Sequence, residues 1–127
     1  MATKRDRALE EKWRDVLRCH AQVSCALERA LAPHRLGVSE FEVLDRLVEG
    51  GADSARIQEI GDEIHLSQSA LSRVIGRLER DGFVSRSLCP EDRRSVSVCP
   101  TAEGRRRFAE ALPDYHAVLA DTLGARR

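Results

Sequence analysis

A change of hydrophobic period at Gly82 constrains the fold of this chain more than any other feature. After Gly82, the stretches Phe83–Leu88 and Ser95–Cys99 alternate with the two-residue period of β-strands. Ser67 is suited to cap a helix before that point, and Gly82 is suited to the left-handed position that ends one. The sequence therefore predicts a helix that leads directly into a β-hairpin. The apolar residues of that helix recur at 3.6-residue spacing: Ala70, Leu71, Val74, Ile75 and Leu78.

The opposite face of this helix carries short polar side chains in its first turns and arginines further along. This distribution is typical of a recognition helix, whose first residues meet base edges in the major groove while its arginines meet phosphate or guanine. Two other interpretations are open for the helix on its own: a bundle helix with a solvated polar face, or a helix of a protein interface. The residues of the polar face are Gln68, Ser69, Ser72, Arg73, Gly76 and Arg77.

Two shorter helices are expected upstream. The first opens at Val38–Glu40, with Ser39 as its cap, and ends at the loop Gly50–Asp53. The second covers roughly Gln58–His65, and a short turn separates it from the polar-faced helix, which is the helix-turn-helix pattern. With the hairpin, these elements predict a fold that is mainly α with a small β-hairpin wing, a winged helix-turn-helix, over residues 38–100.

Long helices are expected at both ends of the chain. Thr101 is suited to cap the last helix, and Pro113 is expected to kink or break it. The first helix is so apolar that it needs two partners, and we interpret residues 1–35 and 101–127 as dimerisation helices. Packing within a single chain is the alternative. The apolar stripe of the first helix, from about Arg5 to Pro33, consists of Leu9, Trp13, Val16, Leu17, His20, Ser24, Leu27 and Leu31.

Composition limits the function classes. The 127 residues fit one domain, and 21 basic residues balance 21 acidic ones, so the chain lacks the bulk positive charge of many nucleic-acid-binding domains. Between Ser67 and Arg94, however, six arginines face four acidic residues. No apolar run approaches the roughly 18 residues of a membrane span, and the N-terminus has no signal-peptide core. We therefore expect a cytoplasmic protein without membrane contact.

The sequence gives no indication of catalysis. It contains no glycine-rich phosphate loop, no Ser/His/Asp arrangement and no HExxH motif. Cys19, Cys25, Cys89 and Cys99 form neither a CxxC pair nor a zinc-binding spacing, so we expect free thiols, no metal and no cofactor. We predict that the protein is not an enzyme.

The segment from Ile57 to Gly104 resembles the DNA-binding core of the MarR family of winged-helix transcription regulators. IGDEIHLSQSALSRVIGRLERDGFVSR is similar to the helix-turn-helix of that family, and PEDRRSVSV followed by TAEG is similar to its D-R-R…L-T-x-x-G signature. The resemblance implies one winged-helix domain over residues 1–127. It also implies a homodimer that represses transcription from a pseudo-palindromic site until a small aromatic or phenolic ligand, or oxidation of a cysteine, releases it.

Residue by residue, the resemblance implies a set of DNA contacts. Arg94 would enter the minor groove from the wing, oriented by Asp92, while Arg93 and Arg86 would support phosphate contacts. The chemistry agrees, because an arginine at a hairpin tip meets the negative potential of a narrow minor groove and a nearby carboxylate can orient its guanidinium. A solvated surface ion pair is the alternative. The major-groove and phosphate contacts would be Gln68, Ser69, Ser72, Arg73 and Arg77.

Effector and redox sites are less sharply defined. Trp13, His20, His34 and Tyr115 could line a ligand cleft, although Trp13 and His20 are more typical of core positions. Redox-sensing relatives keep a reactive thiol on the first helix, where Cys19 and Cys25 lie, and Cys89 is a loop candidate; a buried, inert thiol is the alternative for the first two. Two further functions stay open: a winged-helix module for protein contact that has lost DNA binding, or a thiol-based sensor within the same family.

Overall fold

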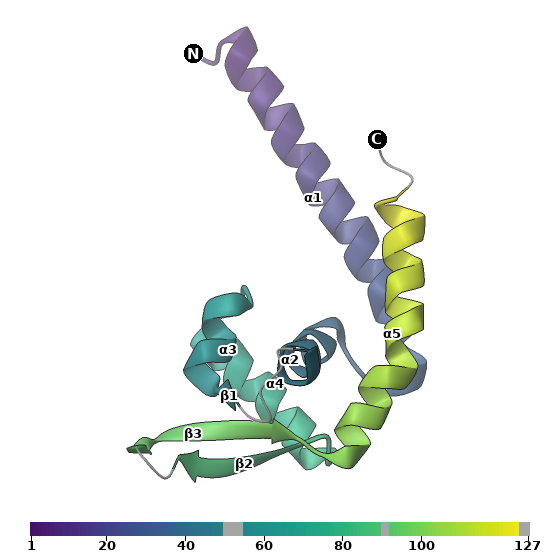
Figure 1. Ribbon diagram of the computed structural model, residues 1–127. Helices are drawn as coiled ribbons and strands as arrows, with labels where there is room; N and C mark the ends of the chain where they lie inside the picture. Colours follow the sequence, from purple (N-terminus) through teal and green to yellow (C-terminus); the bar gives the residue numbers. More distant parts are fainter. Residues whose placement is uncertain (50–54, 90–91, 125–127) are drawn as a thin grey trace.

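The computed structural model describes residues 1–49, 55–89 and 92–124, and the side chains at 55, 56, 58, 88, 89 and 92–96 also lie outside its described part. It confirms the predicted fold, mainly helical with a β-hairpin wing (Figure 1). The elements in order are α1 (Lys4–Leu31), η1 (Ala32–His34), α2 (Val38–Glu49), β1 (Ala55–Arg56), α3 (Ile57–Glu63), α4 (Gln68–Arg80), β2 (Val84–Cys89), β3 (Asp92–Pro100) and α5 (Ala102–Thr122).

Helix α4 begins and ends where the sequence predicts. The Ser67 hydroxyl oxygen accepts a hydrogen bond from the Ala70 N–H at 3.2 Å, as an N-cap does. Gly82 has φ 81°, in the left-handed region, and the next N–H, that of Phe83, bonds back to the Leu78 carbonyl at 2.8 Å. The predicted apolar face is buried, at Leu71, Val74, Ile75 and Leu78.

Among the described residues, the sheet has three antiparallel strands in the order β1-β3-β2. Strand β3 begins at Asp92, where Cys89 pairs with it, and not at Ser95 as predicted. Asp92, Arg93 and Arg94 therefore belong to the strand and not to the loop. Strand β1 was not predicted, because two residues are too few to show a period and the strand exists only through its pairing with β3.

The start of α2 corrects one predicted cap. Ser39 lies inside the first turn of the helix, which already begins at Val38. The free N–H groups at this end donate to carboxylates instead: Gly37 to Glu40 Oε1 at 3.3 Å, and Val38 to Glu28 Oε1 at 3.2 Å. Because Glu28 lies on α1, this cap is a tertiary contact, which local sequence does not reveal.

Helix α5 packs against both α1 and α2. Thr101 caps it as predicted, with its Oγ1 accepting from the Gly104 N–H at 3.0 Å. Of the kink or break predicted at Pro113, the break is wrong, because the helix is continuous through that residue; the helix does bend along its length (Figure 1). An aromatic stack ties it to α2, since the Phe41 ring lies 5.1 Å from the Phe108 ring and 4.3 Å from that of Tyr115.

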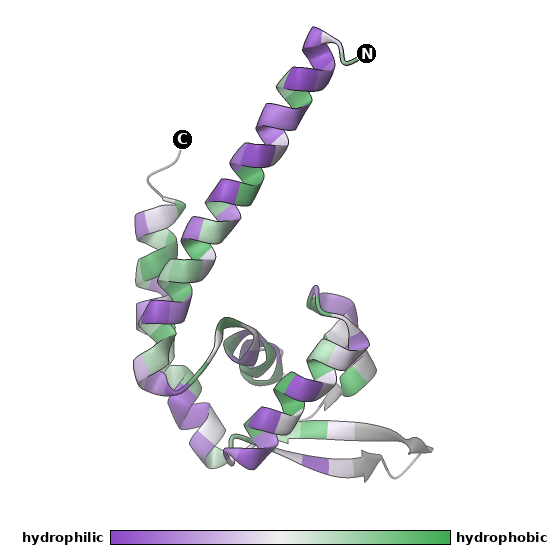
Figure 2. Cartoon of the chain, turned by 180° about the vertical axis from the view of Figure 1, so that it is seen from behind, coloured by the Kyte–Doolittle hydropathy of each residue, from purple (hydrophilic) through white to green (hydrophobic). Residues whose placement is uncertain are grey.

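Helix α1 extends well beyond the rest of the chain. Its C-terminal part lies beside α5, whereas its N-terminal part projects away from the body (Figures 1 and 2). Of the predicted stripe, only Leu27 and Leu31 are buried; the core interpretation of Trp13 and His20 is wrong, because both are exposed. The large apolar side chains left exposed on α1 are Leu9 (52%), Trp13 (61%), Val16 (58%) and Leu17 (47%).

Candidate nucleic-acid interface and effector cleft

The outward face of α4 carries most of the predicted contact residues. Gln68, Ser69, Ser72 and Arg73 are all exposed, on the side of the helix opposite its buried apolar face. The hydroxyls of Ser67 and Ser69 lie 3.3 Å apart. Within the described residues, no hydrogen bond or ion pair holds the side chains of Gln68, Ser72 or Arg73, which leaves their donors and acceptors available to a partner.

Two of the predicted contact arginines are paired inside the chain. Arg77 Nε lies 3.7 Å from Glu40 Oε1, and Arg86 Nε lies 3.2 Å from Glu79 Oε1. Their side chains keep exposed fractions of 48% and 35%, so each guanidinium still reaches solvent with part of its surface. Burial raises the pKa of the Glu40 carboxyl, while hydrogen bonding from the Gly37 N–H and the charge of Arg77 oppose that rise.

For the predicted wing residues, the structure describes the backbone but not the side chains. The backbone places Asp92, Arg93 and Arg94 at the start of β3, on the strand that carries the chain back from the end of the hairpin. Their side chains lie outside the described residues, as does that of Cys89. The wing assignment of these residues accordingly stays a prediction.

Arg80 is an exposed residue of this face that the sequence interpretation left out of the contact set. It lies seven residues after Arg73, two helical turns further on the same face of α4. The signal was present in the sequence, as a row of arginines at the spacing of helical turns. Arg80 lies in the last turn of α4, where an arginine also stabilises the helix C-terminus through the helix dipole. Its position therefore has an explanation that does not involve DNA.

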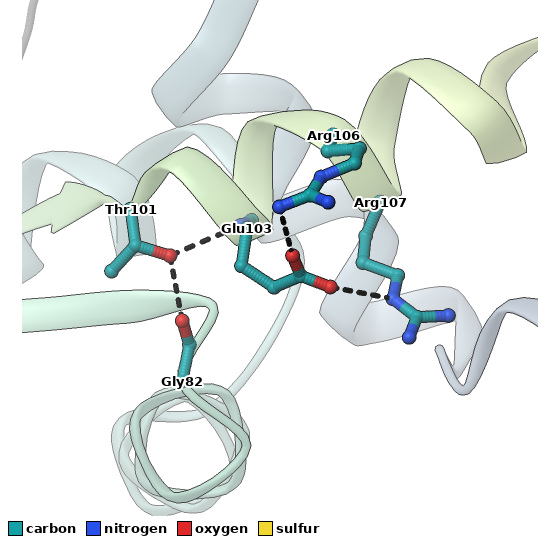
Figure 3. Close-up of polar contacts among 6 residues, drawn as sticks. Gly82, Thr101, Glu103, Arg106 and Arg107 are labelled. Carbon is teal, nitrogen blue, oxygen red and sulfur yellow. Dashed lines mark hydrogen bonds and ion pairs between the residues drawn. The ribbon is translucent and has the colours of Figure 1, made fainter.

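The T-x-x-G motif forms a joint behind the interface (Figure 3). Thr101 Oγ1 donates to the Gly82 carbonyl at 2.6 Å, and the Thr101 N–H donates to the Phe83 carbonyl at 3.0 Å. A Cβ on Gly104 would stand 2.0 Å from that same Phe83 oxygen, so the close approach requires glycine. The motif therefore fixes the end of α4, the start of the wing and the start of α5 at one point.

Glu103 reinforces this joint from within the motif. Its carboxylate pairs with Arg106 at 2.5 Å and with Arg107 at 3.3 Å (Figure 3). The Arg107 guanidinium in turn lies over the ring of Phe83, 5.7 Å from its centroid. Arg107 thus links the start of α5 to Phe83, a role that the sequence interpretation did not assign to it.

A cleft of about 610 Å³ separates α1 from the helix-turn-helix. Of the four predicted effector residues, His20 and Tyr115 line it. Trp13 is exposed and does not line it, and His34 is engaged elsewhere, with Nε2 2.7 Å from Asp114 Oδ2. The lining side chains that sequence reasoning missed are Ser24, Glu28, Val38, Ser39, Glu42, Asp45, Arg46, Glu63, Ile64, His65 and Leu66.

Helical spacing could have found part of this lining. On α1, His20, Ser24 and Glu28 follow at intervals of four residues, where the apolar stripe becomes polar. On α2, Glu42 and Asp45 are three residues apart and face the same cleft. Burial raises the pKa of both carboxyls and of the Tyr115 phenol, and the negative charges of Glu42 and Asp45 raise the Tyr115 pKa further.

The cysteines are free thiols at three of their four positions, and Cys89 lies outside the described side chains. Cys25 is exposed, so its interpretation as a buried residue is wrong for the chain on its own, and Cys19 and Cys99 are partly exposed. In the part of the chain that is described, no group of three or more His, Cys, Asp or Glu side chains could hold a metal ion. Across those same residues, no helix is both long and apolar enough to span a membrane.

Comparison with known proteins gives a consistent result. Residues 36–96 match the MarR family model, which places the match on the helix-turn-helix and most of the wing. The HTH-type transcriptional regulator MhqR of Bacillus subtilis is 26% identical over 106 residues, covering 84% of this chain and 72% of that protein. Two further B. subtilis relatives match over only 58% and 53% of their own length, so this chain spans little more than half of them.

Solved structures share the whole arrangement. AbsC of Streptomyces coelicolor, described as a MarR family transcriptional regulator, superposes with a TM-score of 0.84 at 26% identity, over 96% of this chain and 80% of that one. The M. tuberculosis transcriptional regulator MOSR, solved in complex with DNA, gives a TM-score of 0.77 at 25% identity, over 88% of this chain and 80% of that one.

Proposed function

This chain belongs to the MarR family of winged-helix, DNA-binding transcriptional regulators, and from that premise we propose that it is a homodimeric repressor of a pseudo-palindromic operator. In the proposed complex α4 enters the major groove and the wing reaches the adjacent minor groove. Residues 38–100 supply the DNA-binding part, and residues 1–35 and 101–127 supply the dimer. We place this activity in the cytoplasm.

One observation carries the proposal: Gln68, Ser72 and Arg73 are exposed on the polar face of α4 and have no partner within the described residues, while Leu71, Val74, Ile75 and Leu78 on the opposite face are buried. Ser72 and Arg73 occupy the first half of that face, where residues of a recognition helix reach base edges. The joint at Thr101 holds the wing beside the same helix. The relative MOSR, which was solved with DNA, shares this fold. In the proposed complex, Arg86, Arg93 and Arg94 neutralise phosphates or enter the minor groove, and Asp92 orients Arg94.

The exposed stripe of α1 supports the dimer. Leu9, Trp13, Val16 and Leu17 each expose between 47% and 61% of their surface along the projecting part of the helix. Burying such side chains contributes about 1.5–3 kcal/mol each, which favours a second copy of the chain as their partner. Leu123, just after the end of α5, is also exposed, with 46% of its surface accessible to solvent.

We further propose that an effector bound in the cleft controls DNA binding. The volume of about 610 Å³ lies within the range of roughly 300–1,000 Å³ typical of small-molecule sites. An aromatic or phenolic effector is what the family resemblance implies. A thiol-based response is a second candidate, favoured by the exposure of Cys25 on α1; peroxide would then release DNA from the protein, and Cys25→Ser would abolish that release.

The proposal is tested by binding to DNA from the region upstream of the chain's own gene. We expect tight, salt-sensitive binding of that fragment and weaker binding of a scrambled duplex of the same length. Sedimentation should find a dimer in the absence of DNA. Equal binding of both duplexes, or none, would instead support a protein-contact module that has lost its operator.

A further inference from the structure

The effector cleft carries an excess of negative charge. Four carboxylates line it, against one permanent cation, Arg46. That cation is already engaged, because Arg46 Nη1 lies 3.3 Å from Glu63 Oε2. Glu28, Glu42 and Asp45 remain, and of these Glu28 is occupied by the Val38 N–H.

Glu42 and Asp45 stand out among these groups. They are one helical turn apart on α2, both are partly buried, and neither has a hydrogen bond or an ion pair within the described residues. The charged or titratable groups around Glu42 are Asp45, Arg46 and His65, and those around Asp45 are Arg46, Glu49 and His116. Partial burial disfavours the ionised forms of both carboxyls, and the charge of Asp45 adds to this effect at Glu42, so a bound cation would stabilise their ionised forms.

The rest of the lining suits the apolar part of a small ligand. Val38, Ile64 and Leu66 supply aliphatic surface, and the aromatic ring of Tyr115 faces the same space. The Tyr115 ring is held against Phe41, with 4.3 Å between centroids, so it is a fixed platform. An aromatic ring attracts a cation through its negative face, and does so more strongly where water is excluded.

We propose that this cleft binds a small organic cation, a protonated amine on a compact apolar body, whose charge lies against Glu42 and Asp45. A phenolate or a carboxylate would meet these groups with like charge. A metal ion is disfavoured, since the described side chains offer no cluster that could hold one. The regulatory consequence rests on the proposed function, whereas the preference for charge rests on the cleft alone.

The test compares three ligands of one shape. Calorimetric titration of the full chain at pH 8 uses 2-phenylethylammonium, 2-phenylethanol and phenylacetate. We expect the amine to bind at least about tenfold more tightly than the alcohol, and the alcohol more tightly than the acid. Equal affinities for the three ligands, or the reverse order of affinities, overturn the proposal. The absence of binding by all three also overturns it.

Two variants assign the preference to its residues. Glu42→Gln and Asp45→Asn should each weaken amine binding by roughly tenfold and leave alcohol binding unchanged, because the amides keep the shape and remove the charge. Glu110→Gln is the matched control, since Glu110 is exposed on α5 and does not line the cleft. Unchanged amine binding in both cleft variants, with thermal unfolding showing that they are folded, refutes the assignment.

A third measurement separates this inference from the proposed function. If the amine binds as expected, the affinity for the upstream DNA fragment is measured with and without it. Amine binding without specific DNA binding supports the cleft inference and refutes the operator proposal. Specific DNA binding without amine binding supports the operator proposal and refutes the cleft inference.

Discussion

Arg77 of α4 lies with its Nε 3.7 Å from Oε1 of Glu40, whose side chain is only 12% exposed. The same carboxylate oxygen accepts the N–H of Gly37 at the start of α2. One partly buried group thus joins the α2 N-terminus to the helix that we place in the major groove. Glu40 of α2 therefore helps to position the Arg77 side chain on α4.

Replacement of Glu40 by glutamine should strengthen DNA binding. The amide still accepts the Gly37 N–H, but the charge that holds Arg77 is gone, so the guanidinium becomes available to a phosphate. We expect a severalfold gain in affinity at fixed salt and a salt dependence steeper by about one charge, measured by fluorescence anisotropy. Glu10→Gln, which removes the exposed partner of Arg14 far along α1, should change neither quantity. No change in the Glu40 variant would mean that Arg77 does not face DNA.

Substitution of Gly104 by alanine should destabilise the fold strongly. The added methyl would stand 2.0 Å from the Phe83 carbonyl oxygen, which belongs to backbone and cannot swing away. A loss of about 2–4 kcal/mol in the free energy of unfolding is expected in urea titrations. Gly76→Ala is the control, because its methyl would meet only Arg86 Nη2 at 3.8 Å and should gain about 0.5–1 kcal/mol of helix propensity. If the two substitutions changed the free energy of unfolding by similar amounts, the close contact between Gly104 and the Phe83 carbonyl would be contradicted.

The joint also shows how far the sequence determines the fold. The helix from Gln68, its cap at Ser67 and the switch to strands after Gly82 are local features, and local patterns predicted them correctly. The cap of α2 by Glu28 and the pairing of β1 are tertiary contacts, which no local period encodes. The exposure of Trp13 was missed for a different reason: an apolar stripe shows that a helix needs a partner, but not whether that partner belongs to the same chain.

In the candidate site too, features set by local sequence could be predicted and features set by tertiary packing could not. The polar face of α4 could be predicted, because helical spacing alone separates it from the apolar face. The pairing of Arg77 and Arg86 with carboxylates could not, since each depends on how two elements pack. The acidic lining of the cleft likewise comes from α1, α2 and the end of α3, which are distant in sequence and meet only in the folded chain.

Replacement of Glu42 by glutamine should raise the melting temperature near neutral pH. Burial raises the pKa of this carboxyl in the folded state, so its contribution to stability is present below its unfolded pKa and is lost as the pH rises through the folded value. The neutral amide avoids that loss. We expect a gain of at most about 1 kcal/mol at pH 7.5, because the group is half exposed, and little gain at pH 4. A larger gain in stability at pH 4 than at pH 7.5 would contradict burial as the cause of the raised pKa of Glu42.

The fluorescence of Trp13 should report dimerisation. It is the only tryptophan of the chain, and its ring is 61% exposed on the projecting part of α1. On dilution through the dimer dissociation range, its emission should move to longer wavelength as the ring becomes solvated. Leu17→Glu, which places a charge on the same stripe, should produce the monomer spectrum at every concentration. An emission maximum that does not change with concentration, for a protein that sediments as a dimer, would exclude this stripe from the interface.

The affinity of Arg73→Ala for the upstream DNA fragment, compared with that for a scrambled duplex, tests the central claim most directly. Arg73 is exposed at the centre of the polar face of α4 and has no partner within the described residues. The measurement is anisotropy of the upstream DNA fragment and of a scrambled duplex, from low to physiological salt, with Arg14→Ala on α1 as a control of equal charge change. We predict a loss of about 1–3 kcal/mol on the upstream fragment, a smaller loss on the scrambled duplex and no loss for Arg14→Ala. Equal affinities for wild type and Arg73→Ala on both duplexes would contradict the assignment of α4 as the helix that reads DNA.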